Sequence, residues 1–329
     1  MDIRIALDAM GGDHGAHVTV PAAANFLARN PQAQIILVGQ EPVLRAEMKS
    51  AGLSGDARVR VQHASEVVTM DEAIAAALRS KRDSSMRVAI DLLKSGEADA
   101  CVSAGNTGAL MAISRFVLKM LPGVERPAIA SMLPTRRGRT LMLDLGANVD
   151  CSPLHLLQFG IMGSVLFGVV EQVDKPSVGL LNIGSEEIKG NELVKQASEL
   201  LKGSGLNFYG NVEGDDIYRG TTDVVVCDGF VGNVVLKFYE SAGRMFMGMM
   251  KQAFPDVLGR PEARQLFKFL DYSEYGGAPL LGVKGVVIIC HGASAARAIK
   301  NAVRVAAQMV TSHLDQDIGA ELAEGGASR

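Results

Sequence analysis

Seven polar, glycine-rich segments hold the residues of this sequence that are most able to do chemistry, and each follows a short apolar run that reads as a strand. They are Asp8–Asp13, Ser103–Gly108, Asp144–Asn148, Asn182–Gly184, Asn211–Gly214, Asp228–Asn233 and His291–Ser294. Glycine lets backbone N–H groups close on an anion, and the start of a following helix favours negative charge. Ligands of open parallel sheets bind beyond the carboxyl ends of the strands. Together the seven loops predict a pocket for a small oxyanion such as phosphate.

Two side chains in or beside these loops could act on a substrate directly. Lys189, in the segment Asn182–Asn191, is the only cation of the loops and could bind a phosphate oxygen as a point charge. It could equally be a solvated lysine near a helix start. His291 could orient a nucleophile or polarise a carbonyl, or it could simply cap the helix that follows.

Several common site types are missing from the sequence. No GxGxxG follows the first strand, no phosphate loop ends in Lys-Ser or Lys-Thr, no GxSxG is present and no His pair has zinc spacing. These absences argue against the usual nicotinamide enzymes, nucleotidases, serine hydrolases and zinc enzymes. The loop aspartates could share a metal, but we favour the alternative that each bonds the amides of its own loop. These residues are Asp8, Asp13, Asp144 and Asp228.

Strand-like and helix-like patterns alternate along the chain. Strands are expected at Ile3–Leu7, Ile35–Val38, Val59–Gln62, Ala100–Ser103, Ala128–Leu133, Thr140–Leu143, Ser177–Leu181, Asn207–Tyr209, Val224–Cys227 and Val286–Cys290. Helices are expected at Val18–Arg29, Thr107–Leu121, Asn191–Lys202 and Ser294–Leu314. This alternation predicts an α/β three-layer sandwich with a largely parallel sheet covered on both faces. No linker or repeat interrupts it, so we expect residues 1–329 to form a single catalytic domain.

Composition narrows the function further. With 48% apolar and 21% charged residues the chain is globular, and its net charge of −3 and lack of Trp give nucleic acid nothing to bind. Four widely spaced cysteines are expected to be reduced and mostly buried, and the N-terminus does not read as a signal peptide. Both features predict a cytosolic protein. Residues 154–173 approach the length of a membrane span, but their small residues recur every four positions, as in a packing or dimer helix.

A second helix has an amphipathic pattern. Within Gly243–Phe254, Arg244, Gly248, Lys251 and Gln252 share a narrow polar face. The opposite face is apolar and is expected to contact a membrane through Phe246, Met247, Met250, Phe254 and Leu258. Burial against the core or a second subunit is the alternative. We expect a helical protrusion around residues 237–272.

Read together, the loops resemble one family. The matching motifs are DAMGGDHG from Asp8, SAGNTGALM from Ser103, DLGANVD from Asp144, NIGSEEIKGN from Asn182, GNVEG from Gly210, DVVVCDGFVGNVVLK from Asp223 and GAPLLGVKG with HGAS from Gly277 to Ser294. In this order they are similar to the bacterial phosphate acyltransferases, the PlsX family, over nearly the whole chain. Ala16 and Ser241 stand where the family commonly has proline and glycine.

The resemblance implies a reaction and a setting. It implies transfer of a long-chain acyl group from acyl carrier protein (ACP) to inorganic phosphate, giving an acyl phosphate for phospholipid synthesis without a cofactor or metal. It also implies a homodimer in the cytoplasm that associates peripherally with the membrane and its glycerol-3-phosphate acyltransferase. The implied fold is akin to the isocitrate and isopropylmalate dehydrogenases and the phosphotransacetylases.

These considerations give a hypothesis for the site. Lys189, Asn233 and His291 are assigned to catalysis, by balancing phosphate charge and fixing the carbonyl or the phosphate. Substrate binding is assigned to Asp8, Gly11, Gly12, Asp13, Ser103, Gly105, Asn106, Thr107, Asp144, Asn148, Asn182, Asn191, Asn211 and Asp228. Two basic groups could dock the acidic ACP or could be ordinary solvated charge. They are Arg297, Lys300 and Arg304, and Arg136, Arg137 and Arg139.

Three alternatives stay open. A phosphotransacetylase-like enzyme acting on short acyl-CoA would share the same loops. A metal- and NAD-dependent hydroxyacid dehydrogenase would need a set of substrate-binding arginines that these loops lack. A non-catalytic membrane scaffold would use the amphipathic helix alone.

Overall fold

The computed structural model describes residues 3–254, 256, 260 and 276–327. The chain divides into two compact units, each of which contains parallel and antiparallel strand pairs. The first contains Met1–Pro127 and Gly276–Gly319, and the second contains Ala128–Tyr275 and Ala320–Arg329. Both units follow the α/β plan expected from the sequence. The assignment of the two to one catalytic domain stays a prediction.

The first unit is built on a sheet whose described strands run in the order β3-β2-β1-β4-β11-β10. Their bounds are β1 Arg4–Asp8, β2 Gln34–Gly39, β3 Val59–His63, β4 Ala100–Ser103, β10 Ala278–Leu281 and β11 Val286–Ile289. All neighbours pair in parallel except β10, which is antiparallel to β11. β4 and β11 are buried along their whole length, as expected for strands covered on both faces.

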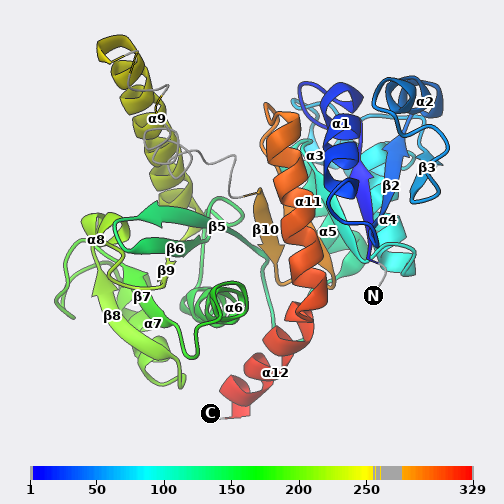
Figure 1. The fold of residues 1–329 in the computed structure, drawn as a ribbon. Coiled ribbons are helices and arrows are strands. Elements are labelled where there is room, and N and C mark those ends of the chain that lie inside the picture. The colour runs from blue at the N-terminus through cyan, green and yellow to red at the C-terminus, as the bar shows by residue number, and fades with distance from the viewer. Residues whose placement is uncertain (1–2, 255, 257–259, 261–275, 328–329) are drawn as a thin grey trace. The chain divides into compact units, whose positions relative to one another are not determined.

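Helices cover both faces of this first sheet (Figure 1). One layer contains α1 Ala16–Leu27, α2 Glu41–Ser50 and α11 Ala296–Thr311, and the other contains α3 Ile74–Arg79, α4 Ser85–Ser95 and α5 Thr107–Leu118. Local sequence fixes their ends: the Ser84 side chain caps α4, and Gly96 ends it in a left-handed conformation. The last helix, α12, spans Leu314–Ala327.

The second unit has a sheet in the order β5-β6-β9-β7-β8 among its described strands. The bounds are β5 Ala128–Thr135, β6 Gly138–Leu143, β7 Ser177–Leu181, β8 Asn207–Val212 and β9 Val224–Val226. β5 and β6 form an antiparallel hairpin, and the other pairings are parallel. Its helices are α6 Pro153–Glu171, α7 Glu192–Lys202, α8 Gly214–Arg219 and α9 Gly229–Ala253.

Helix α6 is the one described helix that is long and apolar enough to cross a membrane. However, 61% of its most apolar 18-residue window is buried. A side chain on Gly160 would place its Cβ 2.9 Å from Leu201 of α7, and one on Gly163 would lie 2.8 Å from Leu143 of β6. These glycines therefore let α7 and the sheet approach closely, which is the packing role predicted for this segment.

Helix α9 extends away from the sheet of its own unit (Figure 1). Gly229 and Gly232, in its first turn, are its only buried residues. Phe246 and Phe254 are exposed, and Met247 and Met250 are half-buried. The structure therefore contains the helix expected at Gly243–Phe254, as the end of the longer helix α9. Leu258 lies outside the described residues. Membrane contact stays a prediction.

The four cysteines are free. Cys101 in β4, Cys227 after β9 and Cys290 after β11 are buried, and Cys151 is half-buried. Burial raises the pKa of the Cys290 thiol to about 12 and holds the pKa values of Cys101 and Cys227 well above their usual range. The expectation of reduced, mostly buried thiols is confirmed.

Candidate active site

In the first unit, three predicted site residues lie at one edge of the sheet. Asp8 ends β1, Ser103 ends β4 and His291 follows β11. Because β1, β4 and β11 are neighbouring parallel strands, their carboxyl ends share that edge. The sequence prediction of a loop cluster is therefore correct within this unit.

Asp8 and Ser103 form a buried hydrogen-bonded pair. The Ser103 hydroxyl donates to Asp8 Oδ2 at 2.6 Å and accepts from the Gly105 N–H at 3.1 Å. Burial raises the pKa of Asp8, while hydrogen bonds from Ser103, Ser85 and the amides of Met10 and Gly11 act to lower it. The pair fixes the direction of the loop that leads into α5.

Glycines let the three loops approach closely. A Cβ on Gly11 would lie 2.6 Å from Asp8 Oδ2 and 2.8 Å from the Gly105 nitrogen. Gly12 has a φ of 85°, and a Cβ there would lie 2.8 Å from the Gly292 carbonyl oxygen. The Asp13 N–H donates to that same carbonyl at 2.9 Å. Glycine at 11 and 12 is thus a steric requirement of the cluster.

The Asn106 side chain is already engaged within the protein. It caps α5 by accepting from the Ala109 N–H at 3.0 Å, and it donates to the carbonyls of Met70 and Glu72. The backbone N–H groups of Asn106 and Thr107 have no hydrogen-bond partner among the described residues. They stand at the start of a 12-residue helix, where such amides suit an anion.

His291 has a defined tautomer when neutral. Its Nδ1 accepts from the Ala293 N–H at 3.1 Å, so the ring proton is on Nε2. The side chain is exposed. Nε2 can therefore donate a hydrogen bond to a substrate oxygen.

The second unit repeats this plan at its own sheet edge. β6, β9, β7 and β8 are parallel neighbours, so the loops that follow them share one edge. Asp144 Oδ1 accepts from the Ile129, Gly146 and Ala147 amides, and Oδ2 accepts from the Asn148 amide at 2.7 Å and side chain at 2.9 Å. Burial raises the pKa of Asp144, although these hydrogen bonds act to lower it. Asp8 and Asp144 thus hold their own loops, as favoured from the sequence.

Three more predicted residues have structural partners. Asp228 caps α9 by accepting from the Val231 N–H, and Asn191 caps α7 by accepting from the Val194 N–H, both at 2.9 Å. Asn182 accepts from the Ile183 amide and donates to the Lys189 carbonyl. These contacts shape the loops, and any contact with substrate stays a prediction.

Other predicted groups of this unit remain available to a ligand. Lys189 is exposed, and its ammonium forms no ion pair with a described residue. Asn233 is exposed in the second turn of α9, beside Gly146. Asn211 is buried and donates to the Glu186 carbonyl at 3.2 Å, but its Oδ1 has no described partner. A buried oxygen that accepts no hydrogen bond within the protein could accept one from a bound ligand that carries an N–H or O–H group.

Sequence reasoning missed the segment around Met70 and did not single out Ser85. The Met70 carbonyl accepts from Asn106, and its Cε would lie 2.7 Å from a Cβ on Gly292. Ser85 supports the Asp8 carboxyl. Neither follows a strand, so the pattern that revealed the other loops carried no signal for them.

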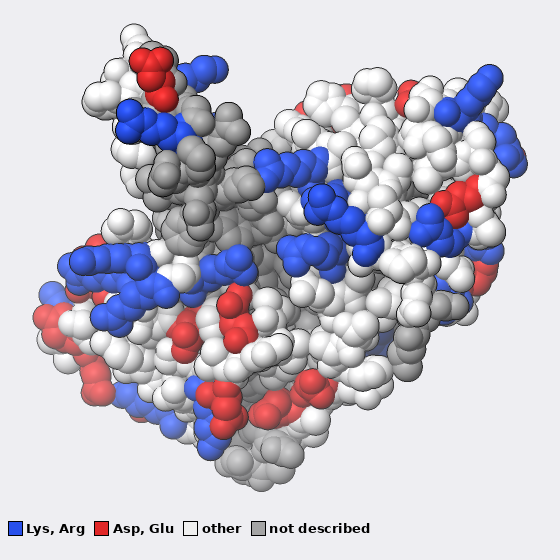
Figure 2. All heavy atoms as spheres, viewed as in Figure 1, with Lys and Arg blue, Asp and Glu red and all other residues white. Residues whose placement is uncertain are grey.

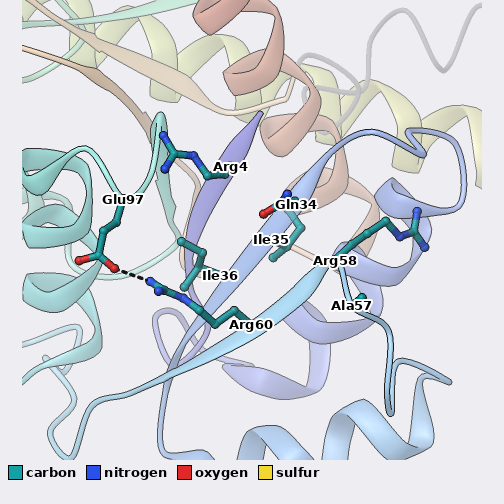
Figure 3. A pocket seen from close by; sticks show the side chains of 8 residues that line it. All are labelled: Arg4, Gln34, Ile35, Ile36, Ala57, Arg58, Arg60 and Glu97. Atoms are coloured by element: carbon teal, nitrogen blue, oxygen red, sulfur yellow. Dashed lines mark hydrogen bonds and ion pairs between the residues drawn. The ribbon is translucent and has the colours of Figure 1, made fainter. Parts of the chain in front are cut away.

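A separate pocket of about 170 Å³ lies at the opposite edge of the first sheet, where β1 and β2 begin (Figure 3). It is lined by Arg4, Gln34, Ile35, Ile36, Ala57, Arg58, Arg60 and Glu97. Its three arginines have carboxylate partners: Arg4 pairs with Asp99 at 2.8 Å, Arg58 with Asp56 at 2.6 Å and Arg60 with Glu97 at 2.9 Å. Their charges are therefore matched, and the pocket is a poor anion site.

No group of three or more His, Cys, Asp or Glu residues in the described part of the chain could hold a metal ion. Three of the loop aspartates, Asp8, Asp144 and Asp228, instead accept from backbone amides or a hydroxyl, whereas Asp13 is exposed.

The fold and loops define a class: a mixed α/β protein with backbone amides at the carboxyl ends of its strands, an arrangement that suits a small anion. A family model described as fatty acid synthesis protein matches residues 3–316. The phosphate acyltransferase of Paraburkholderia phytofirmans is 53% identical over 312 residues, covering 92% of this chain and 85% of that protein. The chain therefore belongs to the fatty acid synthesis protein family, and the family resemblance read from the sequence is confirmed.

Solved structures agree on the fold. A phosphotransacetylase from Streptococcus pyogenes has a TM-score of 0.63 at 17% identity, covering 96% of this chain and 94% of that one. The EutD phosphotransacetylase from Staphylococcus aureus has the same TM-score at 14% identity, covering 94% of both chains. At such identities the likeness shows the mixed α/β fold alone.

Proposed function

We propose that this protein is an acyl-ACP:phosphate acyltransferase that makes acyl phosphate from a long-chain acyl thioester and inorganic phosphate. The observation that carries the proposal is the 53% identity to a phosphate acyltransferase over 92% of the chain. The amide-rich loop edge of the first unit supplies a physical reason for a phosphate substrate.

In the proposed reaction, an oxygen of phosphate attacks the thioester carbonyl. The new C–O bond forms, the C–S bond breaks, and the carrier thiolate leaves and takes up a proton. Phosphate is already anionic and a thiol has a pKa of about 8.5, so neither a covalent intermediate nor a strong base is needed. The protein must orient the two substrates and stabilise the developing oxyanion.

We assign phosphate binding to the start of α5. The unpartnered N–H groups of Asn106 and Thr107 are the donors there, while the Gly105 amide is held by Ser103. Asp8 and Ser103 act through the loop, because their polar atoms are bonded to each other. His291 Nε2 provides a further donor for the phosphate or the carbonyl oxygen.

In the second unit, the residues that we assign to catalysis are Lys189 and Asn233. Lys189 is a cation without a described carboxylate partner, so it can balance phosphate charge. Asn233 presents an exposed amide at the start of α9. The Oδ1 atom of Asn211 can accept from a protonated phosphate oxygen.

The setting of the enzyme is also part of the proposal. We place it in the cytoplasm, as a homodimer of the isocitrate and isopropylmalate dehydrogenase fold type. Exposed apolar residues on α9 support contact with a membrane surface, where the membrane glycerol-3-phosphate acyltransferase would consume acyl phosphate.

The decisive experiment incubates the purified protein with palmitoyl-ACP, with and without phosphate. We expect acyl phosphate and free ACP only when phosphate is present. The second candidate function is a phosphotransacetylase-like activity, which we include because two phosphotransacetylases have a similar fold. Acetyl-CoA in place of palmitoyl-ACP tests it. Loss of thioester that does not depend on phosphate, or none at all, contradicts the proposed function.

A further inference from the structure

Two neighbouring helices of the first unit start at the candidate phosphate edge. α1 follows the Asp8–Gly15 loop, and α11 follows the loop of His291. The two helices pack against each other, and the Asp13–Gly292 hydrogen bond joins the loops that precede them. Because both helices begin at that edge, the N-terminal ends of their solvent-exposed surfaces adjoin the loops of the candidate phosphate site.

This helix pair has an unusual charge pattern. Neither α1 nor α11 contains an Asp or Glu. α11 instead has Arg297, Lys300 and Arg304, which at a spacing of three and four residues share one side of the helix. We call these three residues the basic face. Arg297 and Arg304 are exposed and Lys300 is half-exposed, and at 1.5 Å per residue the face extends over about 10 Å.

Two of the three residues of the basic face, Lys300 and Arg304, have no acidic partner in the described part of the chain. The Arg304 guanidinium donates to Gln308. Figure 2 shows basic side chains gathered over α11, with no acidic side chain of a described residue among them. The other basic group expected from the sequence differs, because Arg139 pairs with Glu171 at 3.2 Å.

We propose that the basic face is the docking surface for the acidic protein that carries the acyl thioester. This inference rests on the proposed function, which requires such a carrier. The chain has a net charge of −3, so attraction of an acidic partner needs a local positive surface. A carrier held on α11 would have its thioester arm close to the loops at the start of the helix.

The test is steady-state kinetics of Lys300→Glu/Arg304→Glu with palmitoyl-ACP. We expect the KM for acyl-ACP to rise at least about tenfold while kcat changes less than about twofold, because charges at the rim of an interface act mainly on association. Binding of ACP without an acyl group, measured by calorimetry, should weaken in parallel.

The matched control is Lys49→Glu/Lys94→Glu. Both lysines are exposed in the same unit, on α2 and α4, and the substitution changes the charge equally. We expect its KM and its ACP affinity to stay near the wild-type values. A thermal unfolding curve for each variant checks that the fold is retained.

Three results would overturn the assignment. They are an unchanged KM in the Lys300/Arg304 variant, an equal loss in the control, or a loss confined to Arg136→Glu/Arg137→Glu. Palmitoyl-pantetheine, a thioester without the acidic protein, separates this failure from that of the proposed function. If the wild type makes no acyl phosphate from either thioester, the function is wrong, whereas the calorimetry still decides the docking surface.

Discussion

Most polar side chains of the loops hold the backbone rather than point to a ligand. Asp8 accepts from the Ser103 hydroxyl and from amides of its own loop, and Asp144 accepts mainly from amides of its own loop. Three more side chains cap helices: Asn106, Asn191 and Asp228. What they leave available is a short set of donors and acceptors. It includes the Asn106 and Thr107 amides, His291 Nε2, the Lys189 ammonium, the Asn233 side chain and Asn211 Oδ1.

Lys189 gives the sharpest prediction at the residue scale. If its ammonium meets phosphate charge in the transition state, Lys189→Ala should lower kcat/KM for phosphate at least about tenfold, a loss of about 1.4 kcal/mol. The measurement is the initial rate of acyl phosphate formation over a series of phosphate concentrations.

Lys195→Ala is the control for this substitution. Lys195 lies on α7 and pairs with Glu192 at 3.6 Å, so its loss should leave the rate almost unchanged. An unaltered rate in Lys189→Ala would remove Lys189 from the mechanism.

The sequence predicted where the loops lie but not which of their atoms are available. A polar residue after a strand marks the sheet edge, because parallel strands place their ends together. Whether Ser103 donates to a ligand or to Asp8 depends on a residue 95 positions away. Such pairings come from tertiary structure, so the hypothesis could not separate binding residues from those that shape the loops.

At the element scale, α12 is tied to the β10–β11 hairpin by the half-buried carboxyl of Asp315. Asp315, in the first turn of α12, accepts from the Gly285 N–H at 2.7 Å, and burial raises its pKa from 3.8 to about 6. The folded chain therefore holds this proton more tightly than the unfolded chain. Its contribution to the free energy of unfolding is greatest below about pH 4 and is lost as the pH rises to about 6.

Asp315→Asn replaces the carboxyl group with an amide that does not ionise. The substitution should therefore remove the loss of stability at higher pH, while Oδ1 of the new side chain still accepts from the Gly285 N–H. We expect the free energy of unfolding at pH 8 to increase by about 1–3 kcal/mol and its dependence on pH between 4 and 6 to weaken. Urea unfolding at several pH values measures both quantities. Asp317→Asn, an exposed carboxylate on the same helix, should change neither, and an equal effect there would contradict the role of burial.

Helix α9 makes a prediction about lipid. Phe246→Glu/Met250→Glu should reduce flotation with liposomes of anionic lipids, because it places two charges on the apolar side of the helix. Ser241→Glu/Gln252→Glu adds the same charge at two exposed polar positions and should have a smaller effect. Equal flotation of wild type and the Phe246/Met250 variant would refute lipid contact.

Strands were the elements best predicted from the sequence, and their ends mostly agree within two residues. β10 was missed because APLL is short, contains Pro279 and runs antiparallel beside β11. The helix expected at Ser294–Leu314 is α11, which already ends at Thr311. The next helix, α12, begins at Leu314 after a break at Ser312 and His313, where His313 has a φ of 54°. An apolar period of 3.6 continues across such a break, so periodicity alone could not locate it.

For the whole molecule, net charge and local charge predict opposite responses to salt. A chain of charge −3 would repel an acidic carrier, and salt would then raise kcat/KM for acyl-ACP. Attraction to a local basic surface predicts that kcat/KM falls as salt increases. Rates in about 50–500 mM NaCl, a range over which the Debye length shrinks from beyond 10 Å to a few ångströms, distinguish the two. The rate with palmitoyl-pantetheine serves as the reference.

Burial of the cysteine sulfur atoms affects whether the acyl group can be transferred to the protein itself. Any accessible thiolate could exchange with a bound thioester and leave the protein itself acylated. With a pKa of about 12, Cys290 is ionised in only about one molecule in 10⁵ at pH 7, and Cys101 and Cys227 are shielded in the same way. Self-acylation is thereby disfavoured at three of the four cysteines, so the protein's own thiols compete less with phosphate for an activated acyl group.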